Sequence, residues 1–91
     1  MEIKFASNQI VQLANGKHGV VVGFNGKPFL IVFDSYTSKL SRYDGNGDLN
    51  TKNEKYGIVK VFDGSSVSNV SDVFKKRFST DGLPVLWERN S

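Results

Sequence analysis

The sequence predicts a mainly β protein, a small and partly open antiparallel barrel of the SH3-like kind with one short C-terminal α-helix. Short runs of β-branched and aromatic residues alternate with turns rich in Gly and Asn. Two Asn-Gly pairs, at 15–16 and 25–26, suit the positive φ angles of tight hairpin turns. Apolar spacings of three and four residues, which indicate a helix, occur only around residue 71. An OB-like barrel is the alternative architecture.

Chain size and composition limit the functions that this protein can have. Its 91 residues form one domain, 1–91, and 12 Lys and Arg against 9 Asp and Glu give a formal net charge of +3. The lack of Cys excludes disulfides and thiolate metal sites, and the single His excludes a His-rich metal site. No apolar run reaches the roughly 20 residues of a membrane span, and the N-terminus lacks an apolar signal-peptide core. We therefore expect a cytoplasmic protein without membrane contacts.

The first half of the chain predicts a run of antiparallel strands. Residues 10–13 and 18–24 form the first hairpin, and its second strand holds three consecutive valines. Residues 29–33 are apolar at every position, which predicts a central strand covered on both faces. Residues 39–43 alternate between polar and apolar, and the segment Asp-Gly-Asn-Gly-Asp at 44–48 is the strongest turn signal.

The second half adds a strand that alternates less regularly. Residues 56–62 predict a strand with Val59 and Val61 facing inward and Lys60 facing outward. Ile58 and Phe62 share the outward face with this lysine, so we expect another segment to cover them partly.

A helix and a last strand complete the predicted fold. Apolar residues at spacings of three and four define one face of a helix of about two turns. Ser71 is its candidate N-cap and Gly82 its stop. The last strand then follows, with Leu83, Val85 and Trp87 on its inner face. The predicted core is Val11, Leu13, Val20, Val22, Phe29, Ile31, Phe33, Val59, Val61, Phe74, Leu83, Val85 and Trp87.

Three segments carry a resemblance to a known group of chains. They read Leu-Ala-Asn-Gly-Lys at 13–17, Tyr-Gly-Ile-Val-Lys-Val-Phe at 56–62 and Leu-Trp-Glu-Arg at 86–89. In this order they resemble small proteins of bacteriophages and prophages of Firmicutes, over residues 9–89. That family has Asp and Tyr where this chain has Gly57 and Phe62. A function that depends on that carboxylate or that phenol is therefore not expected in this chain. The resemblance implies a phage origin and a bacterial host cytosol, but no activity and no functional residues.

One metal-binding pattern is incomplete. Asp44, Asn46 and Asp48 alternate as at the opening of an EF-hand loop. Leu49 stands where that loop needs Gly, and Lys55 stands where it needs the bidentate Glu. We interpret the segment as a hairpin turn and expect no metal.

Catalytic patterns are also incomplete. His18 lies beside a tight turn, and no nucleophile elbow accompanies it. The glycines of the first hairpin do not match a phosphate-binding fingerprint, and a barrel of this size with short loops rarely encloses a catalytic pocket. We therefore expect no enzymatic activity and no cofactor, and interpret His18 as an exposed turn residue.

Nucleic acid is a candidate partner on charge and aromatic content. A basic cluster stands at the end of the predicted helix and tyrosines could stack on bases; these candidate contact residues are Lys75, Lys76, Arg77, Tyr36, Tyr43 and Tyr56. The helix dipole alone explains three basic residues in a last helical turn. Nucleic-acid binding therefore ranks second.

Protein binding ranks first, because small barrels recruit peptides by adding a strand at an exposed edge or through an aromatic groove. The same tyrosines and Trp87 are candidate groove aromatics, although the register of Trp87 favours the core. The predicted function is a non-enzymatic phage accessory protein that binds a host macromolecule, for example to inhibit a bacterial defence or regulatory complex. The alternatives are weak nucleic-acid binding and sequestration of a small nucleotide, and the oligomeric state stays open.

Overall fold

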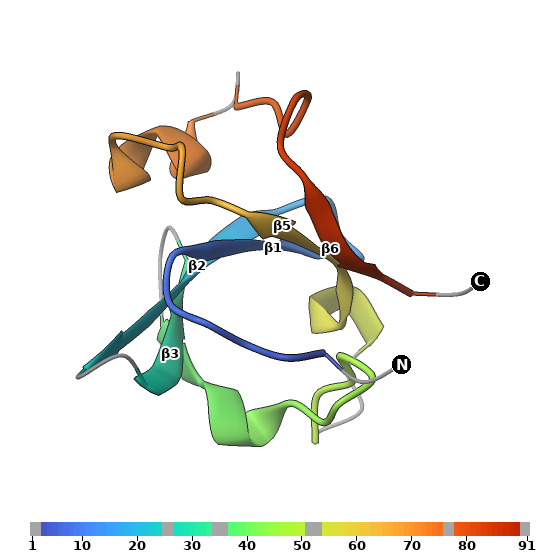
Figure 1. Cartoon of the computed structure of the whole chain (residues 1–91). Coiled ribbons are helices and arrows are strands. Elements are labelled where there is room, and N and C mark those ends of the chain that lie inside the picture. Colours follow the sequence, from blue (N-terminus) through green and yellow to red (C-terminus); the bar gives the residue numbers. More distant parts are fainter. Residues whose placement is uncertain (1–2, 25–26, 34–36, 51–53, 76–77, 90–91) are drawn as a thin grey trace.

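The computed structural model describes residues 3–24, 27–33, 37–50, 54–75 and 78–89. Within these ranges, antiparallel strands form one open six-stranded sheet in the order β4-β3-β2-β1-β5-β6 (Figure 1). This confirms the mainly β class. The strands are β1 (Gln9–Leu13), β2 (His18–Phe24), β3 (Lys27–Val32), β4 (Thr37–Lys39), β5 (Ile58–Asp63) and β6 (Val85–Glu88).

The first hairpin forms as its sequence predicts. Gly16 has a φ of 86°, which side chains disfavour, and the Asn15 side chain accepts a hydrogen bond from the Lys17 N–H at 2.9 Å. β1 pairs with β2 on one side and with β5 on the other, so it lies inside the sheet. The predicted turn at 25–26 falls outside the described residues.

Apolar clusters cover both faces of the sheet. The first lies between the sheet and two covering segments, the N-terminal segment and residues 40–50 (Figure 1). The Ile3 N–H donates to the Gly45 carbonyl at 2.7 Å, which joins the two covering segments. The second cluster lies under the 3-10 helix η3 (Val70–Phe74) and contains Ile10, Val20, Phe62 and Val73.

A register shift in β5 changes which side chains face the core. Gln12 pairs with Lys60 but Leu13 pairs with Ile58, so Val59 is an additional residue in β5. The bulge turns Ile58 to the same face as Val61, and both are fully buried. Val59 is only partly buried, so its placement in the core is wrong, and the prediction missed Ile58.

A second register shift changes β6. Trp87 pairs with Val61 and Val85 pairs with Phe62, which leaves Leu86 as the additional residue. Val85 and Trp87 therefore face opposite sides of the sheet. Val85 is 52% exposed, so its placement in the core is also wrong.

The rest of the predicted core divides between buried and partly buried positions. The buried ones are Val11, Leu13, Val20, Ile31, Phe33 and Val61. Those that are partly buried against one of the clusters are Val22, Phe74, Leu83 and Trp87. The side chain of Phe29 lies outside the described structure. Phe62, which we expected to be partly covered, is buried beneath the second cluster.

The C-terminal helix is shorter and differently capped than predicted. It is a 3-10 helix of five residues, and Asn69 rather than Ser71 is its N-cap. β-branched residues and a Ser-Asp pair disfavour a longer α-helix here. Gly82 (φ 86°) lies in the turn that precedes β6 instead of ending the helix.

Two shorter 3-10 helices complete the described secondary structure. The predicted strand at 39–43 ends early, because η1 (Leu40–Arg42) follows β4 directly. η2 (Glu54–Tyr56) precedes β5. No helix in the described ranges has the length and apolar character needed to cross a membrane.

Candidate functional site

Of the six contact residues predicted from sequence, the three that the structure describes do not form one surface. Tyr43 is only 8% exposed, and its hydroxyl donates to the Tyr56 carbonyl at 3.0 Å. Tyr43 therefore offers no stacking face, because its ring fills the first apolar cluster. Tyr56 is partly buried against the same cluster. Lys75 is exposed, and its Nζ lies 2.7 Å from Asp72 Oδ1. Three further candidates lie outside the described residues: Tyr36, Lys76 and Arg77.

The segment 44–48 forms a turn stabilised by its own side chain. Asp44 Oδ1 accepts from the N–H groups of Asn46, at 2.8 Å, and Asp48, at 3.0 Å. That carboxylate oxygen is thus engaged with the backbone. In the described parts of the chain, no group of three His, Cys, Asp or Glu residues could hold a metal ion.

His18 is not the exposed turn residue that we expected. It opens β2 opposite Gln12 and is partly buried, with its ring 5.3 Å from that of Phe78 in an edge-to-face arrangement. Desolvation by this burial lowers the pKa of His18 below its ordinary value.

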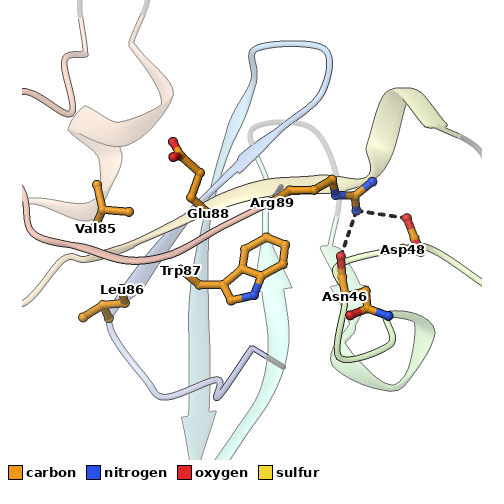
Figure 2. A pocket seen from close by; sticks show the side chains of 7 residues that line it. All are labelled: Asn46, Asp48, Val85, Leu86, Trp87, Glu88 and Arg89. Atoms are coloured by element: carbon orange, nitrogen blue, oxygen red, sulfur yellow. Dashed lines mark hydrogen bonds and ion pairs between the residues drawn. The ribbon is translucent and has the colours of Figure 1, made fainter. Parts of the chain in front are cut away.

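A groove of about 560 Å³ lies between β6 and the turn at 44–48 (Figure 2). β6 is the last strand of the described sheet, so one side of the groove is a strand edge. The groove is lined by Asn46, Asp48, Val85, Leu86, Trp87, Glu88 and Arg89.

Arg89 holds the two walls of the groove together. Its Nη2 lies 3.0 Å from the Asn46 carbonyl and 3.0 Å from Asp48 Oδ1 (Figure 2). Gly47, between these partners, has a φ of 80°, and a Cβ there would lie 2.6 Å from the Ile58 carbonyl. Only glycine lets the turn approach β5 and Arg89 this closely.

The two ends of the groove differ in chemistry. At one end are Val85 and Leu86, the exposed large apolar residues of the described structure, each 52% exposed. Figure 2 shows them on opposite sides of the strand, with Trp87 on the same side as Leu86. Toward the other end lie two separate carboxylates, Glu88 on the side of β6 that carries Val85 and Asp48 beyond Arg89 (Figure 2), with side chains 58% and 57% exposed. The groove therefore runs from an apolar end to an acidic end.

A smaller cavity, of about 170 Å³, lies beside the second apolar cluster. Its lining combines apolar and uncharged polar residues: Asn8, Ile10, Val20, Gly64, Ser65, Val67 and Val73. It contains no charged side chain and fits incomplete packing of a small core better than a binding site.

Of the groove residues, sequence reasoning identified only Trp87 as a candidate. The available signal was Leu86, an apolar residue at an outward position of the predicted last strand. A single outward apolar side chain is common on protein surfaces, so this signal alone could not locate the groove. Asn46 and Asp48 could not be assigned to the groove, because their contacts with Arg89 join positions far apart in the sequence, 43 residues in the case of Asn46.

Comparisons of the chain with protein-family models, with curated proteins and with solved structures find no match.

Proposed function

We propose that this chain is a non-enzymatic binding module that holds a segment of another protein in the groove beside β6. One observation carries the proposal: the terminal strand of the sheet exposes Val85 and Leu86 next to a groove containing Trp87. Exposed apolar groups beside an available strand edge are what strand-adding peptide sites present. A host protein in the bacterial cytosol, such as a component of a defence or regulatory complex, is the partner that the phage resemblance favours.

Nucleic-acid binding stays the second candidate, with less support than protein binding. Two of the cations that it could use, Lys60 and Lys75, lie within 3.0 Å of carboxylates. The buried ring of Tyr43 is also not available to stack on a base.

Sequestration of a small nucleotide has less support still. Asp48 and Glu88 line the larger described groove, and carboxylates repel phosphate. Its one cation, Arg89, already contacts Asp48.

The absence of catalysis is part of the proposal. His18, the one histidine of the chain, does not line the described groove. Asp48 and Glu88 each form an ion pair, with Arg89 and Lys60. The described groove lining also contains no Ser, Thr, Cys or Lys that could act as an activated nucleophile beside these carboxylates.

The finer fold assignment that we propose for this module is the SH3-like barrel rather than the OB-like one. β1 to β4 are consecutive neighbours in the sheet, and β5 returns to pair with β1. η2 lies immediately before that returning strand. This order is what we expect of a small SH3-like barrel, with β6 added at its edge.

The proposal is tested by protein capture from a bacterial host lysate with wild-type protein, Leu86→Ser and Lys39→Ser. Lys39 is exposed on β4, at the opposite edge of the described sheet, and serves as the matched control. We expect wild type and Lys39→Ser to retain the same protein and Leu86→Ser to lose it.

Capture should also survive nuclease treatment. A partner held equally by all three proteins would contradict the proposed site. Capture of nucleic acid alone, weakening steeply with salt and lost in Lys75→Glu, would favour the second candidate.

A further inference from the structure

Resting on the proposed function, we infer that the groove selects an extended peptide that adds a strand to β6, with apolar residues at one end and a Lys or Arg at the other. The apolar residues cover Val85 and Leu86. The basic side chain lies toward the end of the groove that carries Glu88 and, beyond Arg89, Asp48 (Figure 2).

The backbone of β6 favours an extended partner. The Arg89 N–H donates to the Val59 carbonyl at 2.9 Å, so it points into the sheet. Because successive peptide groups of a strand point in opposite directions, the Glu88 N–H points toward the outer edge. In the described structure no further strand lies on that side. An extended peptide can therefore pair with β6 through main-chain hydrogen bonds.

The bulge at Leu86 provides an apolar contact on each side of the added strand. Figure 2 shows Leu86 and Trp87 on one side of β6 and Val85 on the other. Side chains of an added strand alternate between the same two sides. Apolar residues at successive positions of the peptide can therefore cover Val85 and Leu86 at once.

The acidic end determines the charge that the peptide should carry. Asp48 and Glu88 outnumber Arg89 among the groove residues, although the whole chain has a formal net charge of +3. Both carboxylates are more exposed than their partners Arg89 and Lys60, whose side chains are 33% and 40% exposed. An incoming cation therefore reaches the carboxylates more readily than an incoming anion reaches those cations.

A second copy of this chain fits the groove less well. β6 has four residues, an edge of about 14 Å, whereas a stable dimer interface buries about 1,600 Å² in total. Two-fold pairing about Leu86 and Trp87 would also place each Glu88 opposite a Val85. We therefore assign the groove to a peptide and treat self-association as an outcome of the test.

The test selects random peptides displayed on phage against wild-type protein and against three variants. They are Leu86→Ser, the charge-neutral double variant Asp48→Asn with Glu88→Gln, and the control Lys39→Ser. All four must show the same cooperative thermal transition. We expect wild type and Lys39→Ser to select apolar peptides with Lys or Arg at one fixed end. Leu86→Ser should select none above background.

Affinity measurements then use the best selected peptide and its Lys-to-Glu or Arg-to-Glu analogue. Trp87 is the only tryptophan of the chain, so its fluorescence reports binding at the groove directly. We expect the basic peptide to bind about tenfold more tightly, and this ratio to fall to about one in the charge-neutral variant. Methylation of one alternate set of peptide N–H groups should abolish binding, while methylation of the other set should not.

The outcomes separate this inference from the proposed function. Equal affinity for basic and acidic peptides, or equal effects of both methylated sets, overturns the inference and leaves the groove as a protein-binding site. Absence of selected peptides, or binding unaffected by Leu86→Ser, overturns both. Sedimentation that shows self-association, lost in Leu86→Ser, identifies a second copy as the occupant and also overturns the inference.

Discussion

At the scale of single residues, two valines in neighbouring strands should respond oppositely to the same substitution. Val61 is fully buried in the first cluster, whereas Val85 is 52% exposed. Val61→Asp places an unpaired charge in an apolar site, which a chain this small cannot accommodate, so we expect it to unfold the protein. Val85→Asp should change the free energy of unfolding by less than about 0.5 kcal/mol. Circular dichroism with thermal melting checks both, and equal melting curves would contradict the assigned burial.

The partial burial of His18 predicts a loss of stability in mild acid. Desolvation lowers the pKa of His18 from 6.5, so the unfolded chain binds its proton more readily than the folded one. The contribution of His18 to stability is fully present above pH 6.5, the pKa in the unfolded chain. It is lost as the pH falls from there through the lowered pKa of the folded state. Asp63, whose hydrogen bonds from Ser65 lower its pKa from 3.8, contributes at a lower pH.

The measurement for His18 is the melting temperature at about pH 7.5 and about pH 5.5. Wild type should lose more stability between these values than His18→Gln, which cannot titrate. An equal loss in both proteins would show that His18 is not the group responsible.

Residue identity predicted much of the core and failed where exposure depends on register. Val11, Leu13 and Ile31 are buried as their alternation indicates. Tyr43 was misassigned because the sequence does not show that the segment containing it covers the sheet. A tyrosine suits either position, since its ring is apolar and its hydroxyl needs only one partner.

At the scale of elements, Asn69 should matter more than Ser71 to the 3-10 helix η3. Asn69 Oδ1 accepts from the Ser71 N–H at 3.1 Å and from the Ser71 hydroxyl at 2.8 Å. Asn69→Ala removes the acceptor of a helix N–H, at a cost of about 0.5–1 kcal/mol. Ser71→Ala leaves the backbone hydrogen bond in place and should cost less. Urea unfolding of both variants checks this order, and the reverse order would restore Ser71 as the cap.

The strands were predictable as elements, but their bulges were not. Periodicity located β1, β2, β3, β5 and β6 within a few residues. The added residues Val59 and Leu86 follow no local pattern, because a bulge arises from pairing with a neighbouring strand. Each bulge reversed the alternation beyond it, which explains the errors at Ile58 and Val85.

At the scale of the whole molecule, the sheet lies between two small apolar clusters and contributes side chains to both. This explains why β2 contains consecutive valines: Val20 packs in the second cluster and Val21 in the first. From the sequence we predicted such covering on both faces only for the apolar run at 29–33. The sequence did not indicate which strand lies at the edge beside the groove, because that depends on the return of β5 to β1.

The contact of Arg89 with the turn at 44–48 should stabilise the packing of that turn against the sheet, over the first cluster. This contact and the Ile58 N–H, which donates to the Gly47 carbonyl at 2.8 Å, hold the same turn against the sheet. Arg89→Ala should lower the free energy of unfolding by about 1–2 kcal/mol, because the lost hydrogen bonds have a charged donor. Lys60→Ala, which breaks the more exposed ion pair with Glu88, should cost less than about 1 kcal/mol.

Urea unfolding gives both energies, and hydrogen exchange locates the effect. In Arg89→Ala the Ile58 amide should exchange faster, because the turn opens locally. Arg89 takes no part in the pairing of β1 with β2, so the amides of that hairpin should stay protected from exchange. Faster exchange throughout the sheet would mean that Arg89 stabilises the whole fold. Unchanged exchange at Ile58 would mean that the turn stays in place without Arg89, and the groove wall that it forms would then be set by Gly47 and β5 alone.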